Sequence, residues 1–232
     1  MKRTYKLIFI LFFFINTSGF AQTNTLKINI TPTFGNLVLQ LADSFFIAND
    51  STQLQVDVLK FYISKVQLLN DGKIVLEEKN SFHLIDASEL KSVLLPIENK
   101  ENIHFDELKF DLGIDSTTNV SGAMGGDLDP TKGMYWTWQS GYINFKLEGK
   151  SKLCKTRNSE FQFHLGGYQQ PNYCVQTLRF QITNSSVINL KLDLKKIFQQ
   201  IDLAKTNHIM SPCLEAVLLS KIVSNSLTVI EN

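Results

Sequence analysis

Short runs in which apolar and polar residues alternate recur along most of this chain, and they constrain its fold more than any other feature. Leu-Lys-Ile-Asn-Ile at 26–30 is the first run, and Phe-Gln-Phe-His-Leu at 161–165 is a later one. Because successive side chains of a β-strand point to opposite faces of its sheet, this alternation predicts strands with one buried face. Further strands are predicted at 36–41, 54–58, 61–68, 73–76, 81–85, 105–112, 134–138, 145–147 and 178–182.

The spacing of apolar residues becomes helical near the C-terminus. One helix is predicted over 192–203, and a second begins with Ser211 as N-cap and Pro212 at the first helical position. Many strands followed by one or two helices, without an alternating strand–helix order, predict an all-β dominated fold, an antiparallel β-sandwich with one or two C-terminal helices. After the first 21 residues, the rest of the chain, 22–232, suits a single domain.

The first 21 residues have the pattern of a secretory signal peptide. Lys2, Arg3 and Lys6 precede an apolar run at 7–15, and small residues lead to a predicted cleavage between Ala21 and Gln22. The run is shorter than the roughly 20 residues that span a bilayer, although an uncleaved anchor is the alternative. We therefore expect a periplasmic or secreted protein with no membrane span after cleavage.

Charge and motifs exclude several functions. The 23 basic and 22 acidic residues are balanced and form no long run of one sign, so nucleic acid is not an expected partner. The sequence contains no Gly-x-Ser-x-Gly elbow, no phosphate-binding glycine loop and no His-Glu-x-x-His pair. We therefore expect a binding protein and not an enzyme.

Export would allow the three cysteines to form a disulfide. Cys154 and Cys174 bracket an apolar stretch that contains a Gly-Gly turn, which favours a bond between them and leaves Cys213 free. The alternative is that all three are buried thiols, because a domain of this size does not need a disulfide.

A glycine-rich and aspartate-rich segment over 114–132 predicts a long irregular loop. Within it, Asp127 and Asp129 suggest a calcium site, or an Asx-turn beside Pro130 as the simpler alternative. The loop leads into a predicted strand in which Trp136 and Trp138 share one face, one step after Met134.

These aromatic and thioether groups pack in the core or, with imidazole, line a copper(I) site. Alternation puts His164 on the face opposite Phe163 and Leu165, where it points into a pocket or packs in the core. His83 has the same β setting and the same two interpretations.

The run Gly-Met-Tyr-Trp-Thr-Trp-Gln-Ser-Gly-Tyr at 133–142 resembles the MbnP family of copper-binding proteins of the bacterial envelope, which are associated with methanobactin operons. Stretches at 59–68, 125–130, 145–149 and 163–166 support the resemblance. In that family a tryptophan of the Trp-x-Trp strand is oxidised to kynurenine by a dihaem peroxidase-like partner, and the product binds copper together with histidines.

The resemblance implies copper ligands at His164 and at Trp136 or Trp138, with His83 as a further candidate. The chain departs from the family pattern at one step, because Asn119 is followed by Val120 where methanotroph members have a histidine. We therefore expect an exported copper-associated binding protein. The alternatives are a metal-free structural or partner-binding module and a carbohydrate-binding module that uses exposed tryptophans.

Overall fold

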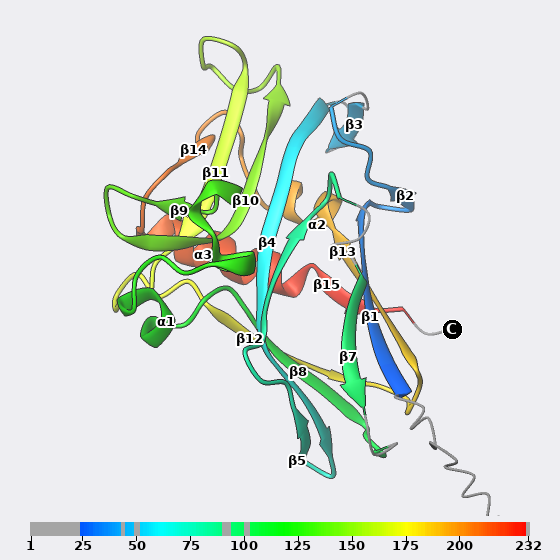
Figure 1. Cartoon of the computed structure of the whole chain (residues 1–232). Helices are drawn as coiled ribbons and strands as arrows, with labels where there is room; N and C mark the ends of the chain where they lie inside the picture. Colours follow the sequence, from blue (N-terminus) through cyan, green and yellow to red (C-terminus); the bar gives the residue numbers. More distant parts are fainter. Residues whose placement is uncertain (1–23, 43–44, 49–51, 90–93, 100–102, 231–232) are drawn as a thin grey trace, which may run out of the picture.

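The computed structural model describes residues 24–42, 45–48, 52–89, 94–99 and 103–230. The predicted signal peptide lies outside these residues. Two β-sheets face each other, as the larger and smaller groups of strands in Figure 1 show.

The smaller sheet has five strands. Its order is β15 (Leu227–Val229), β13 (Val187–Asp193), β1 (Asn24–Phe34) and β2 (Leu37–Val38), and β7 (Leu94–Asn99) also pairs with β1. The predicted strand at 36–41 is reduced to β2, and the sequence patterns did not predict β7, β13 or β15.

The larger sheet has ten strands, built around β4. Its order is β12 (Gln176–Gln181), β8 (Glu107–Leu112), β4 (Thr52–Asn70), β10 (Gly141–Ser151), β11 (Glu160–Gly166) and β14 (His208–Ile209). The strands β3 (Phe45–Ala48), β5 (Lys73–Glu77) and β6 (Phe82–Asp86) also pair with β4, and β9 (Tyr135–Trp136) pairs with β10. The two runs predicted at 54–58 and 61–68 are therefore parts of one strand.

The main core lies between the two sheets. It combines residues of the smaller sheet, such as Ile28 and Leu190, with residues of the larger sheet, such as Leu59, Phe145 and Phe163. Burial of one face of each sheet is the packing that defines a sandwich, so the predicted fold class is confirmed. The sheets are mixed rather than purely antiparallel, because β1 pairs with β13, and β11 with β14, in parallel.

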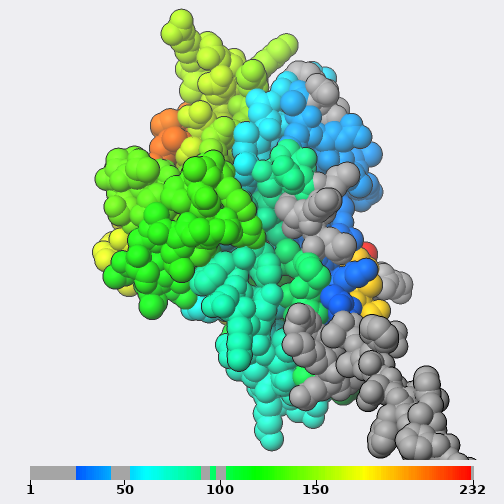
Figure 2. Space-filling view, viewed as in Figure 1, coloured from blue at the N-terminus to red at the C-terminus, as the bar shows by residue number. Residues whose placement is uncertain are grey.

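A second, smaller core lies on the opposite face of the larger sheet. The predicted loop covers this face with three short turns of helix: α1 (Ser116–Val120), η1 (Gly126–Leu128) and η2 (Pro130–Lys132). In Figure 1 this segment lies beside β4 on the side away from β1, and its green atoms form a lobe of the surface in Figure 2. The buried residues beneath it are Tyr62, Leu84, Ile114, Leu128, Met134, Trp136, Tyr142 and Ile143.

Two helices lie in the C-terminal part of the chain, as predicted, but their bounds differ and the short strand β14 lies between them. The helix α2 spans only Leu194–Phe198, because β13 continues to Asp193, whose side chain caps the helix by accepting from the backbone N–H of Lys195. The helix α3 spans Leu214–Asn225 and its N-cap is Cys213 rather than Ser211. Among the described residues, no helix is both long and apolar enough to cross a membrane.

The predicted Cys154–Cys174 disulfide is wrong, and all three cysteines are free thiols. Cys154 lies in the turn before β11, whereas Cys174 follows the other end of that strand. At roughly 3.3 Å per residue, a seven-residue strand separates them by about 20 Å. The Gly-Gly step turns the chain beyond β11 and does not fold it back alongside that strand.

Candidate metal site around His164 and Trp136

His164 lies on the outer face of the larger sheet. Its neighbours Phe163 and Leu165 are fully buried in the main core, so the predicted alternation is confirmed. The His164 side chain points the other way, and the residue is still only 6% exposed. Its Nε2 lies 2.5 Å from Oε1 of Glu148 on the adjacent strand β10.

Glu148 determines which nitrogen of His164 is protonated. The hydrogen bond from His164, together with the positive charge of Lys146, holds the pKa of the Glu148 carboxyl below its usual value, although partial burial acts against both. An ionised carboxylate only accepts hydrogen bonds, so Nε2 of His164 must be the donor. In the neutral imidazole, Nδ1 then carries the lone pair, which is the state that a metal ligand needs.

Trp136 lies on the same face of the larger sheet and packs over Gly166 of β11. It pairs with Gly141 in the β9–β10 ladder, and its ring covers Gly166 of β11. A Cβ atom on Gly166 would lie 2.6 Å from Cζ3 of Trp136, which explains why glycine occupies this position. Gly166 is two residues after His164, so the His164 side chain and the Trp136 ring over Gly166 lie on the same face of β11.

The Trp136 indole is buried, but its N–H group forms no hydrogen bond with the described residues. The residue is 6% exposed, and its Nε1 has no hydrogen-bond partner among the described residues. A buried donor without a partner costs roughly 1–3 kcal/mol, so this group is a candidate for a functional role.

Trp138 does not share a strand face with Trp136, and that prediction is wrong. The strand β9 ends at Trp136, and residues 137–140 form a turn that ends at Ser140 with a positive φ of 52°. Trp138 is therefore 67% exposed, while its ring centroid remains 6.0 Å from that of Trp136. A carbohydrate-binding surface built from two exposed indoles is not present, because only one of them reaches solvent.

Met134 is fully buried in the second core and packs as an ordinary core residue there. Of the two interpretations of this thioether, core packing and a copper(I) site, the structure agrees with core packing.

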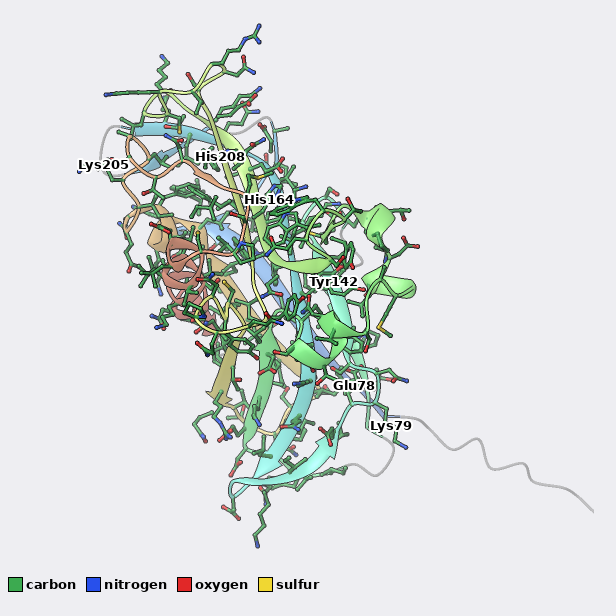
Figure 3. All side chains as sticks on the ribbon, turned by 90° about the vertical axis from the view of Figure 1, so that its left-hand side faces the viewer. Glu78, Lys79, Tyr142, His164, Lys205 and His208 are labelled. Carbon is green, nitrogen blue, oxygen red and sulfur yellow. The ribbon has the colours of Figure 1, made fainter. Side chains whose placement is uncertain are left out.

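The structure does not bring His83 to this site. His83 pairs with Ile63, a residue of the main core, so its side chain is on the opposite face of the sheet from His164. Its Nε2 contacts Oε2 of Glu78 at 2.7 Å, and Figure 3 places Glu78 well away from His164.

Asp127 and Asp129 hold the covering loop together through hydrogen bonds. Asp127 accepts from the backbone N–H of Leu84 at 3.0 Å and pairs with Lys132 at 2.6 Å. Asp129 accepts from the backbone N–H of Thr131 at 2.8 Å, which is the Asx-turn alternative. The part of the chain that the structure describes contains no cluster of three His, Cys, Asp or Glu residues suited to a metal ion.

Asn119 connects the loop to the tryptophan turn. Its Nδ2 donates to the carbonyl of Ile114 at 2.9 Å, and its Oδ1 accepts from the backbone N–H of Tyr142 at 2.8 Å. Tyr142 directly follows Gly141, the partner of Trp136. Val120, the residue that follows Asn119, is 72% exposed beside this junction.

Sequence reasoning did not assign a role to Glu148 or Gly166, although both lie in stretches that carry the family resemblance. Only the alternation of the predicted strands could have pointed to these two residues. Alternation shows which face of a sheet a residue lies on, but not which residue lies next to it on the neighbouring strand.

The fold and site together define a β-sandwich protein with a histidine–tryptophan cluster beneath a long loop on the outer face of one sheet. The MbnP family model matches residues 23–211, and the chain therefore belongs to the MbnP family, as its resemblance predicted. Its structure is similar to MbnP from Methylosinus trichosporium, with a TM-score of 0.59 and 13% identity over 85% of this chain and 88% of that one. At this identity the likeness establishes a common fold. No curated protein matches the sequence.

Proposed function

We propose that this protein is an exported copper-binding protein of the bacterial envelope, not an enzyme, and that His164 anchors the metal beside Trp136. The observation that carries the proposal is the geometry of His164. Its Nε2 is engaged by Glu148, which leaves Nδ1 as the coordinating nitrogen, and the Trp136 ring packs on Gly166 two residues away. Carboxylate–imidazole pairs of this kind orient histidine ligands in metal sites.

Copper(I) suits this set of groups. Imidazole is a good ligand for copper, and apolar rings nearby exclude water, which favours the reduced ion. The chain supplies one suitable histidine here, so a second donor is required. Membership of the MbnP family suggests a tryptophan oxidised to kynurenine by a dihaem partner. Trp138 is accessible to such a partner at 67% exposure, whereas the Trp136 ring packs over Gly166, two residues after His164.

Competition between the purified protein and a copper(I) chelator tests the proposal. We expect stoichiometric uptake that is lost in His164→Ala and retained in His83→Ala, a matched control in which the removed imidazole lies on the other face of the sheet. Uptake that does not depend on His164 would contradict the assignment. The intact mass of the protein isolated from its native envelope shows whether a tryptophan has been oxidised, and peptide mapping shows which one.

Val120 offers a gain-of-function test. Val120→His restores the Asn-His step of the family pattern at an exposed position next to Asn119, so folding should be unaffected. We expect tighter copper(I) binding, because an additional imidazole donor becomes available at the edge of the site. Leu214→His, at a similarly exposed position on α3, is the control that should leave affinity unchanged.

A metal-free, partner-binding module is the second candidate function. Three large apolar side chains are exposed on the covering loop and the tryptophan turn: Val120 at 72%, Met124 at 44% and Trp138 at 67%. Solvent-exposed apolar groups on one segment favour a protein contact. Recovery of a specific envelope protein that is lost in Trp138→Ala, together with no copper uptake, would support this candidate over the first.

Export itself is tested by fractionation. We expect the mature protein in the periplasm or the medium, with Gln22 as its first residue. Retention of residues 1–21 would indicate the uncleaved anchor instead.

A further inference from the structure

Two cysteines that are far apart in the sequence both lie beside the first turns of α3, near enough to interact electrostatically. Cys213 is the N-cap of this helix, and its Sγ lies 3.4 Å from the backbone nitrogen of Ala216. Cys174 is 1% exposed, and its thiol forms a hydrogen bond with Ser220, one turn further along the helix. Ser220 in turn donates to the carbonyl of Ala216 at 2.8 Å. Both thiols therefore lie beside the first two turns of α3, Cys174 in the core and Cys213 at its edge.

The backbone around the two cysteines is also in contact. The backbone N–H of Cys174 donates to the carbonyl of Gly167 at 2.9 Å, and Asn172 contacts the carbonyl of Pro212 at 3.5 Å. A Cβ on Gly167 would lie 3.2 Å from Cβ of Pro212, the residue before Cys213. The segment that follows β11 is thus packed against the beginning of α3.

We propose that Cys174 and Cys213 form a disulfide when the protein folds in the presence of a thiol oxidant of the disulfide class, such as oxidised glutathione. To form the bond, Sγ of Cys213 rotates from its capping position toward Cys174. Cys154 stays a free thiol, because it lies at the opposite end of β11. This inference does not depend on copper binding.

The reaction balances as two thiol–disulfide exchanges. Cys213 is half-buried and lines a surface pocket of about 350 Å³ together with His208 and Glu215, so a small oxidant reaches it first. Its thiolate attacks the oxidant disulfide and releases one thiol. The thiolate of Cys174 then attacks the Cys213 sulfur and releases the second thiol. Two protein thiols are oxidised, one oxidant disulfide is reduced, and the two protons pass to the released thiols.

Burial determines when this reaction is fast. Burial raises the pKa of Cys174 to about 11, and a smaller effect in the same direction comes from the nearby Cys213. Since the thiolate is the nucleophile, oxidation is slow once the native core has closed around Cys174. We therefore expect the bond to form during folding, before Cys174 is fully buried.

The disulfide would stabilise the base of the candidate metal site. Cys174 lies in the segment that follows β11, and its backbone N–H bonds to the carbonyl of Gly167, the residue after Gly166, on which the Trp136 ring rests. Fixing this segment to α3 restrains the end of β11 that carries both Gly166 and the nearby His164.

Counting thiols tests the inference. The protein is refolded in a mixture of oxidised and reduced glutathione, denatured, alkylated and weighed intact. We expect one alkylated thiol in the wild type, none in Cys154→Ser and two in Cys213→Ser, in which serine also caps α3 well. Peptide mapping should find Cys174 linked to Cys213, with a mass lower by about 2 Da for the two hydrogens lost. Three alkylated thiols, a linkage that includes Cys154, or a dimer linked through Cys213 would overturn the inference.

Thermal unfolding provides a second measurement that does not rely on alkylation. A disulfide that closes the 174–213 loop should raise the melting temperature of the oxidised protein by roughly 5–15 °C over the reduced protein. The same shift is expected in Cys154→Ser and should be absent in Cys213→Ser. A shift that persists in Cys213→Ser would show that the stabilising bond is a different one.

Discussion

Glu148 and His164 form a close carboxylate–imidazole pair, 2.5 Å apart, on the outer face of the larger sheet. Lys146 extends the pair toward the covering loop, because its Nζ lies 3.4 Å from Glu148 and also 3.4 Å from the carbonyl of Gly133. Gly133 leads directly into the tryptophan strand. The orientation of the histidine and the position of the loop are therefore coupled through one lysine and one glutamate.

Glu148→Gln should weaken copper(I) binding by roughly 10–100-fold, the usual effect of removing a hydrogen-bonded partner of a histidine ligand. The amide presents no charge to His164 and no longer favours a proton on Nε2. Competition with a chelator measures the change. Glu160→Gln is the control. Glu160 lies at the beginning of β11, the strand that carries His164, and this variant should bind copper(I) as the wild type does. Equal affinity in both variants would mean that Glu148 has no positioning role.

Acid should remove the stabilising contribution of Glu148. Its pKa is lowered in the folded protein by the hydrogen bond from His164 and by Lys146, whereas the unfolded value is close to the ordinary 4.5. A lowered folded pKa stabilises the protein fully above the unfolded value, and this stability is lost as the pH falls through the folded value. Urea denaturation should therefore separate the wild type from Glu148→Gln at pH 6, with the difference shrinking below about pH 4. A difference that grows toward acid pH would contradict this assignment.

The two tryptophans should differ sharply in their contributions to stability. Trp136→Ala empties a buried position in the second core and should cost about 3–5 kcal/mol of unfolding free energy. Trp138→Ala changes an exposed side chain and should cost less than about 0.5 kcal/mol. Chemical denaturation measures both values. Acrylamide quenching provides an independent check, because Trp138→Phe should leave a protected indole and Trp136→Phe an accessible one.

Gly166→Ala tests the contact between the tryptophan turn and β11. The added methyl group would lie 2.6 Å from the Trp136 ring and 2.7 Å from the carbonyl of Tyr142, so the ring or the strand must move. Overpacking of this kind costs about 1–3 kcal/mol of unfolding free energy. Gly125→Ala is the control, since no atom lies within 4 Å of its added Cβ. Similar stability of the two variants would show that the contact with Trp136 is not tight.

The faces of the strands followed directly from the residue pattern. Alternation correctly predicted that Phe163 and Leu165 are buried in the core and that His164 points the other way. Asp71 and Gly72, between the strands predicted at 61–68 and 73–76, form a hairpin turn with positive φ values of 49° and 74°. The apolar spacing over 192–203 predicted one long helix, and this was wrong. The strand β13 continues to Asp193 and the short helix α2 begins at the next residue, so the apolar residues belong to two different elements.

By itself, the sequence determined the sandwich class, the buried face of strands such as β11 and membership of the MbnP family. Only the tertiary structure decided which side chains meet: His164 with Glu148, Trp136 with Gly166, and Cys174 near Cys213 rather than Cys154. The physical reason is that periodicity is a property of one strand, whereas contacts between strands depend on register and on the path of the connections. A shift of one residue in the β10–β11 register would separate Glu148 from His164.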